Sequence, residues 1–381
     1  MPCFGLCGFS SVVAAEVLAF VGDGLPASDC KECSAVFRTN LHWLGPWEKV
    51  LEENGTPDAV PKKLTFGDLA PPPELFARVC GLGSITAAAA FLEKCPAALT
   101  PENILSAFRA AAVKGHLAVC QWLVEGFGLS GGDARARVNF AFHWAAANGH
   151  LAVCQWMVER FKLTGEDARA DDNYAFRNAA TSGHLAVCQW LAECFGLTGV
   201  DARANNNLAF RWAAAQGHLA VCQWMVERFG LTGMDARASD NHAFSGAAEN
   251  GHLAMCRWLV VRFGLTVEDA RADNNEASRY AAAHGHLAVC QWLVEHFGLT
   301  VQDARADNNF AFRMAAAQGH LAVCQWMVER FGLTGEDAQA DNNFAFRWAA
   351  RNGHPDVCQW LTERFAITED MVDGVMADAD N

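Results

Sequence analysis

Histidine is the residue in this chain whose number and spacing could do chemistry. Eight histidines follow a glycine at a constant interval of 34 residues, from His116 to His354. Imidazoles in such numbers could bind zinc or act as acid–base catalysts. Each lies in the same turn of its own repeat, however, so neighbours should be about 8–10 Å apart, too far to share an ion bonded at about 2.0–2.1 Å. We therefore predict turn residues that hydrogen-bond to neighbouring backbone.

Cysteine recurs at the same interval. Eight of the 15 cysteines lie inside HLAVCQW or a close variant, namely Cys120, Cys154, Cys188, Cys222, Cys256, Cys290, Cys324 and Cys358. Helices packed about 8–10 Å apart do not bring one such position within the roughly 7 Å that a disulfide requires. These thiols should be buried in place of valine, which points to a reducing compartment.

One further cysteine pair has the spacing of a zinc half-site. Cys30 and Cys33 form a CxxC motif, and Cys3, Cys7 or His42 could complete it. A zinc ribbon needs a second well-spaced pair, which the sequence lacks. We favour core positions in a small helical module, and we expect no metal and no cofactor.

Composition and motifs argue against several classes of function. The formal net charge is −14, whereas binding to nucleic acid depends on Lys and Arg that neutralise phosphates. The apolar segment 1–22 precedes the first basic residue, Lys31, and contains Glu16, so it fits neither a signal peptide nor a spanning helix. Phosphate-loop and HExxH motifs are absent from the sequence, and we identify no nucleophile elbow. We expect no catalytic residue, no nucleic-acid partner and no membrane partner.

The 34-residue interval is predicted to be built from helices, whose interiors exclude proline, and ten of the 11 prolines lie before residue 102. In the representative unit 319–352, apolar residues at helical spacing predict an amphipathic helix that ends at Gly332. Thr334 and Asp337 resemble a capping box at the start of a very short helix or turn. Asn343 is expected to cap a second main helix, which reaches the next Gly-His pair.

The second main helix separates into a constant face and a variable one. Its alanines and one phenylalanine, such as Ala345 and Phe346, recur from unit to unit and should be buried. Two positions at i and i+4 vary, and they should form an exposed stripe. The residue pairs at these positions are Phe140/Trp144, Tyr174/Asn178, Leu208/Trp212, His242/Gly246, Glu276/Tyr280, Phe310/Met314 and Phe344/Trp348.

Five arginines recur beside this stripe: Arg177, Arg211, Arg279, Arg313 and Arg347. They could form a ladder with the aromatic residues, as in protein-binding hot spots, or each could pair with an aspartate of the adjacent turn (Asp171, Asp273, Asp307 and Asp341); both alternatives stay open. The candidate partner-binding residues on the expected concave surface are Trp144, Arg177, Asn178, Arg211, Trp212, Tyr280, Arg313, Met314, Phe344, Arg347 and Trp348.

The repeat resembles the ankyrin repeat in the run of paired alanines, Gly-His and an apolar helix, read in AAANGHLAVCQWMVE at residues 145–159. The resemblance covers residues 107 to about 365, and the tetratricopeptide pattern is absent. Where ankyrins carry Thr-Pro-Leu-His, this chain has Phe-Ala-Phe-Arg at 344–347. The segment that would be the hairpin finger, LTGEDAQADNN at 333–343, is predicted to be helical or coiled. The resemblance implies that partners bind to the helix surface and not to hairpin tips.

The segment 10–52 lacks the repeat pattern and predicts three helices. Their order and residues resemble an F-box: an apolar first helix, Asp29 opening a second, and a closing Trp. This resemblance implies binding of the Skp adaptor of a cullin ubiquitin ligase. The residues it assigns to the adaptor contact are Val17, Leu18, Val21, Val36 and Trp47.

These observations predict an all-α, ankyrin-like solenoid of 34-residue helix-turn-helix units with a small N-terminal helical module. Residues 1–55 should form the F-box-like module, 56–80 a Pro/Gly-rich linker, 81–114 a degenerate N-terminal capping repeat, and 115–381 the repeats with a C-terminal cap. The near-identity of the repeats is similar in style to F-box/ankyrin families of large DNA viruses and protists.

The function expected from this organisation is protein–protein interaction. The chain would be the substrate receptor of a Skp/cullin/F-box ubiquitin ligase, in which the repeats bind the target and the N-terminal module binds the adaptor. The alternative is an ankyrin-type scaffold or host-interaction protein with no ligase role. We expect a monomer in the cytoplasm or nucleus.

Overall fold

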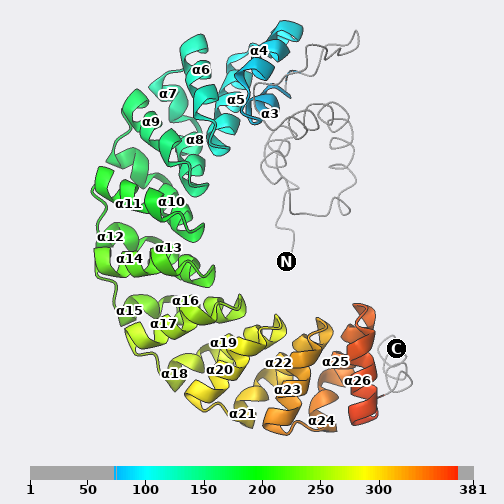
Figure 1. Cartoon of the computed structure of the whole chain (residues 1–381). Helices are drawn as coiled ribbons and strands as arrows, with labels where there is room; N and C mark the ends of the chain where they lie inside the picture. The colour runs from blue at the N-terminus through cyan, green and yellow to red at the C-terminus, as the bar shows by residue number, and fades with distance from the viewer. Residues whose placement is uncertain (1–72, 74, 368–381) are drawn as a thin grey trace, which may run out of the picture. The chain divides into compact units, whose positions relative to one another are not determined.

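The computed structural model describes Pro73 and residues 75–367, in which all regular structure is helical and no strand occurs (Figure 1). The all-α prediction is therefore confirmed for this part of the chain. The N-terminal module, with its predicted adaptor residues and the possible zinc ligands Cys30 and Cys33, lies outside the described residues. No helix between residues 75 and 367 is long and apolar enough to cross a bilayer.

The helices belong to two compact units, which are described separately. The first unit holds α3 Leu75–Cys80, α4 Ile85–Lys94, the 3-10 helix η1 Pro96–Ala98, α5 Pro101–Val113, α6 Leu117–Phe127, α7 Gly131–Ala134, most of α8 Ala136–Ala147, and α9 Leu151–Phe161.

The second unit contains the remaining helices. They are α10 Gly165–Thr181, α11 Leu185–Cys194, α12 Gly199–Ala202, α13 Ala204–Ala215, α14 Leu219–Phe229, α15 Gly233–Ala236, α16 Ala238–Glu249, α17 Leu253–Phe263, α18 Val267–Ala270, α19 Ala272–Ala283, α20 Leu287–Phe297, α21 Val301–Ala304, α22 Ala306–Ala317, α23 Leu321–Phe331, α24 Gly335–Ala338, α25 Ala340–Arg351 and α26 Pro355–Phe365.

Each repeat contains two main helices and a short one. The alanine-rich helices of the second unit, α10, α13, α16, α19, α22 and α25, pack against one another in sequence order and form one layer (Figure 1). The cysteine helices α11, α14, α17, α20, α23 and α26 form the other layer. Alanine is the residue that allows such close approach, and Ala345 and Ala349 are fully buried. Ala350 is exposed in the last repeat, whereas its equivalent Ala316 is buried.

The helix ends follow their sequence signals. Gly332 follows α23 with a left-handed φ of 64°, as predicted from the glycine at that position. Thr334 and Asp337 make the predicted capping box at the start of α24. The segment 333–343, in the place of a hairpin finger, thus contains a four-residue helix, in agreement with the prediction that it is helical or coiled.

The predicted cap of the second main helix is wrong. Asn343 and the two residues before it, Asp341 and Asn342, have φ between 55° and 58°, which is left-handed. An N-cap residue normally has extended backbone and an accepting side chain, but the buried Oδ1 of Asn343 accepts no hydrogen bond. Regular α-helical geometry therefore begins at Phe344. We call this three-residue segment the left-handed turn.

The left-handed turn occurs in every repeat from α8 to α25. Its 21 residues are Asp or Asn except Arg137, Val138 and Ser239. Left-handed φ values cost most L-residues roughly 1–2 kcal/mol, and Asn and Asp tolerate them best because their short polar side chains can bond locally. The Asp/Asn runs thus specify backbone geometry.

The repeat pattern extends to α3. This helix is buried at Leu75, Phe76, Val79 and Cys80 and packs against α5. Its six residues are the end of the segment predicted as linker, so the array includes them. The rest of the predicted domain division stays a prediction.

Candidate protein-binding surface

The repeated histidines bond to backbone of the preceding repeat. His116 Nε2 lies 2.9 Å from the Gly81 carbonyl oxygen, and His150 Nε2 lies 2.9 Å from that of Val113. This confirms the prediction that they hydrogen-bond to neighbouring backbone. Burial lowers the pKa of both imidazoles below its ordinary value of 6.5, although the carbonyl bond acts in the opposite direction. The neutral form is therefore favoured.

The glycine of each Gly-His pair makes room for the next histidine. Gly115 has a φ of 79°, and a Cβ there would lie 2.4 Å from His150 Nδ1. Any side chain would displace the ring and strain the backbone at once. The pair is thus a joint between consecutive repeats.

The repeated cysteines are structural as well. Those from Cys120 to Cys324 are buried free thiols, as predicted, and Cys358 is partly exposed in the last repeat. Burial raises the pKa of Cys120, Cys256, Cys290 and Cys324 to about 12. Thiols are nucleophiles and metal ligands only as thiolates, so these groups are chemically quiet. Among residues 75–367, no three His, Cys, Asp or Glu side chains are grouped to hold a metal ion.

A second joint between consecutive repeats was not predicted from the sequence. In five repeats, the arginine after the short helix forms a bidentate ion pair with the capping-box aspartate 32 residues later. Between Arg237 and Asp269, the Nε–Oδ1 distance is 2.6 Å and the Nη2–Oδ2 distance is 2.8 Å. Asp269 also accepts a 2.8 Å bond from the Thr266 backbone N–H. The equivalent pairs are Arg169–Asp201, Arg203–Asp235, Arg271–Asp303 and Arg305–Asp337. In the sequence, an arginine and an aspartate recur 32 residues apart, two residues less than the repeat, and this spacing could have indicated the contact.

These aspartates hold their negative charge. Burial alone would raise the pKa of Asp269, but hydrogen bonds from Arg237 and Thr266 outweigh it and lower the pKa below the ordinary 3.8. Since the aspartate is also the helix cap, one carboxylate fixes both the short helix and its neighbour. The recurring histidines, arginines and aspartates thus hold consecutive repeats together, and we call these two joints the framework.

The side chains of the variable stripe take no part in these two joints, and most of them are at least partly exposed to solvent. Of its two positions, Trp212 on α13 is 39% exposed, and Tyr280, Met314, Phe344 and Trp348 are partly exposed. Asn178 is also partly exposed, with its Nδ2 3.0 Å from the Tyr174 carbonyl oxygen. In the first unit, Trp144 is partly exposed and lies 5.9 Å from Phe140, ring centre to ring centre.

The aromatic members of the stripe contact one another, both between neighbouring alanine-rich helices and within one helix. The Tyr280 ring on α19 lies 5.5 Å from that of Phe310 on α22. Trp212 on α13 lies 5.1 Å from His242 on α16. Phe344 and Trp348 lie 5.6 Å apart on α25. The rings are thus held by packing before any partner arrives.

The stripe arginines are bonded to the left-handed turns. Arg279, which is buried, donates to the Asp307 carboxylate at 2.6 Å and to the Asp273 carbonyl at 3.1 Å. Arg313 pairs with Asp341 in the same way. For these two arginines, pairing with an aspartate of the adjacent turn is confirmed.

The other three arginines use backbone oxygens. Arg177 donates to the Asp171 carbonyl, Arg211 to that of Asn206 and Arg347 to that of Asp341. Each guanidinium closes the turn that precedes its own helix. Both arginines that pair with an aspartate also stack over an aromatic ring. The Cζ atom of Arg313 lies 5.0 Å from the Phe344 ring centre, and that of Arg279 lies 5.1 Å from the Phe310 ring centre.

Comparison with known proteins identifies the repeat. The family model for ankyrin repeats (3 copies) matches residues 107–206, 142–240, 210–305 and 278–371. Among solved structures, an ankyrin repeat family protein from Legionella pneumophila is 18% identical, covers 77% of this chain and 81% of its own, and has a TM-score of 0.31. No curated protein matches the chain.

Proposed function

The chain belongs to the ankyrin-repeat family, and we propose that it is a protein-interaction scaffold whose contact surface is the stripe on its alanine-rich helices. Ankyrin repeats are typically interaction scaffolds without enzymatic activity. The observation that carries the proposal is the contrast between fixed joints and this one variable, partly exposed line of residues. Its strongest section runs over α19, α22 and α25, where Tyr280, Phe310 and Phe344 follow one another.

The chemistry of this section suits a protein partner. Binding energy at protein interfaces concentrates in aromatic and arginine side chains that are already ordered. Arg351 lies 4.9 Å over the Trp348 ring, and Arg313 lies over Phe344, so the cations hold the rings in place. The exposed carboxylates Asp307 and Asp341 border the same rings. We infer a target that presents an apolar anchor flanked by polar or basic groups.

The test is affinity purification from cells of the source organism with the tagged full chain and Trp348→Ala. A partner of the stripe should be recovered by the unaltered chain and lost from the variant, because truncating a hot-spot tryptophan typically costs about 2 kcal/mol or more. Val261→Ala is the matched control, since Val261 is 84% exposed on the cysteine helix α17. If both variants keep every partner, the surface has been placed wrongly. Circular dichroism checks that Trp348→Ala keeps its helices.

We further propose that residues 1–55 are the F-box-like module and bind the Skp adaptor, so that the scaffold presents its target to a cullin ubiquitin ligase. Support comes from the apolar spacing of Val17, Leu18 and Val21 and from the closing Trp47. The test is co-elution of the full chain with a purified Skp adaptor in size-exclusion chromatography. Leu18→Asp should abolish co-elution, and Trp348→Ala should keep it. Absence of co-elution with the unaltered chain leaves the scaffold without a ligase role.

A further inference from the structure

The core of the second unit is interrupted in one repeat. Seven of the eight alanine-rich helices from α5 to α25 carry a buried phenylalanine at one position: Phe108, Phe142, Phe176, Phe210, Phe244, Phe312 and Phe346. In α19 this residue is Ser278. The exchange removes a whole ring from the interior of the array.

The contacts of the phenylalanines show where the ring would lie. Phe176 packs against two aromatic residues of the next repeat's cysteine helix, with ring centres 6.3 Å from Trp224 and 5.7 Å from Phe229. The residues in the same places relative to Ser278 are Trp326 and Phe331 on α23. Both line a cavity in the structure.

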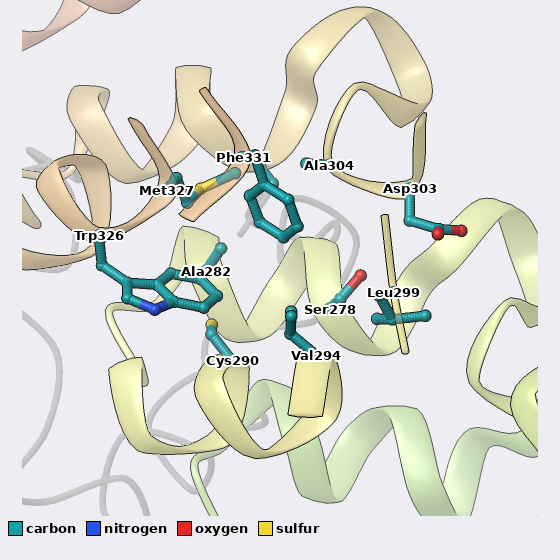
Figure 2. Close-up of a pocket in the computed structure, with 11 residues that line it drawn as sticks. Ser278, Ala282, Cys290, Val294, Leu299, Asp303, Ala304, Trp326, Met327 and Phe331 are labelled. Atoms are coloured by element: carbon teal, nitrogen blue, oxygen red, sulfur yellow. The ribbon is translucent and has the colours of Figure 1, made fainter. Parts of the chain in front are cut away.

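The cavity occupies the place of the absent ring. Figure 2 shows Trp326, Met327 and Phe331 across the space from Ser278 and Val294. The cavity is open to solvent on part of its boundary. Ala304, at the end of α21, also lines it and is 7% exposed, whereas the equivalent alanines are at most 2% exposed. The array has not closed over the missing side chain.

The polar groups at the cavity are already satisfied. The Ser278 hydroxyl donates to the Asn275 carbonyl oxygen of its own helix at 3.1 Å. Asp303 is paired with Arg271 at 2.7 Å and accepts from the Thr300 backbone N–H at 2.8 Å. The rest of the lining consists of aromatic, aliphatic and sulfur-containing side chains and alanines. A charged guest would find neither the Ser278 hydroxyl nor the Asp303 carboxylate free, whereas an apolar guest fits the mostly apolar lining.

We propose that this cavity is a binding site for a small, uncharged molecule with a single aromatic ring. The shape comes from the repeat itself, since a phenylalanine ring occupies the equivalent place in the other repeats. The apolar lining is of the kind that stays dry when empty and takes up an apolar molecule. None of the stripe residues lines the cavity, so this site is independent of the proposed protein-binding surface.

Benzene is the probe, and methionine methyl groups are the reporters. In the full chain labelled with [methyl-¹³C]methionine, benzene should shift the Met327 resonance with a dissociation constant on the order of 1 mM. The Met314 methyl, which lies on the stripe, should not move. Ser278→Phe restores the ring found in the other repeats and should abolish the Met327 shift. If Met327 does not respond at saturating benzene, or still responds in folded Ser278→Phe, the proposal is wrong.

A matched variant tests the reasoning in another repeat. Phe176→Ser recreates the same vacancy beside Trp224, Met225 and Phe229, so the Met225 methyl should begin to respond to benzene while Met327 keeps its response. A response of Met225 without any response of Met327 would show that the natural cavity closes in solution, which overturns the proposal. Should Ser278→Phe fail to fold, Ser278→Leu fills the space with a smaller side chain and must also reduce the Met327 shift.

Discussion

Replacing Val138 by asparagine should stabilise the protein. Val138 is the middle residue of the left-handed turn before the regular part of α8, with a φ of 56°. Every other repeat has Asp or Asn at this middle position, as at Asn206 and Asn342. A β-branched side chain is poorly suited to this conformation because its Cβ approaches the following carbonyl oxygen. The valine therefore strains the backbone of the left-handed turn at residues 137–139.

The magnitude follows from two opposing terms. Left-handed backbone costs an ordinary L-residue roughly 1–2 kcal/mol, most of which asparagine avoids. Val138 is 59% exposed, so the apolar burial that the substitution gives up is a fraction of the roughly 1.5–3 kcal/mol for a fully buried valine. We expect a net gain of about 1 kcal/mol for Val138→Asn.

Urea unfolding of the full chain measures the gain, together with hydrogen exchange of the α8 amides because repeat arrays can open locally. The reverse exchange, Asn342→Val, should destabilise by about 1 kcal/mol, since Asn342 has a φ of 55°. Val200→Asn, at an 81% exposed position of α12, should stay within about 0.5 kcal/mol. If Val138→Asn and Asn342→Val are both as neutral as this control, the turns are not left-handed in solution.

Three further measurements test the joints. Gly251→Ala would place a Cβ 2.5 Å from His286 Nδ1, so urea unfolding should show a loss about 2 kcal/mol larger than for Gly264→Ala, where φ is also positive but nothing lies within 4 Å. Arg237→Gln should cost about 1–2 kcal/mol because it leaves the Asp269 carboxylate without its ion pair, and a double-mutant cycle with Asp269→Asn measures the coupling. Acid titration monitored by circular dichroism should show two declines. Burial lowers the pKa of the histidines, so their contribution to stability is complete above about pH 6.5 and is lost as the pH falls through their folded pKa. The pKa of the aspartates is also lowered, so their contribution is complete above about pH 3.9 and is lost as the pH falls through the folded pKa of the aspartates.

The sequence was sufficient for the repeat and for two of its helix ends because the signals are local. A glycine after an amphipathic helix and a Thr-x-x-Asp pair act within one turn of chain, and both were correct at Gly332 and Thr334. The left-handed turn was missed although its Asp/Asn runs are visible. Asn is favoured both as an N-cap and in left-handed backbone, and composition alone does not separate the two.

The joints and the stripe depend on contacts between repeats, which single-unit patterns do not contain. Arg313 could be read from sequence either as a hot-spot residue or as a partner of Asp341, because both need a long flexible side chain with an unknown rotamer. The structure directs its Nη1 to Asp341 and leaves its face over Phe344, so one residue does both. A single side chain such as that of Arg313 can therefore belong both to the contacts between repeats and to the proposed binding surface.

In a chain of near-identical repeats, the departures from the common residue carry the information, and their meaning depends on where they lie. Val138 departs in a turn that bears on backbone strain, so it should affect stability alone. Ser278 departs in the core, where it removes a ring that the array does not replace, so it should create a binding site. Trp348 and Tyr280 lie at positions that vary throughout and belong to neither joint, so a change there should weaken the binding of a partner. The three classes therefore separate by measurement: a stability shift without a binding change, a ligand response at Met327, and loss of a partner without loss of fold.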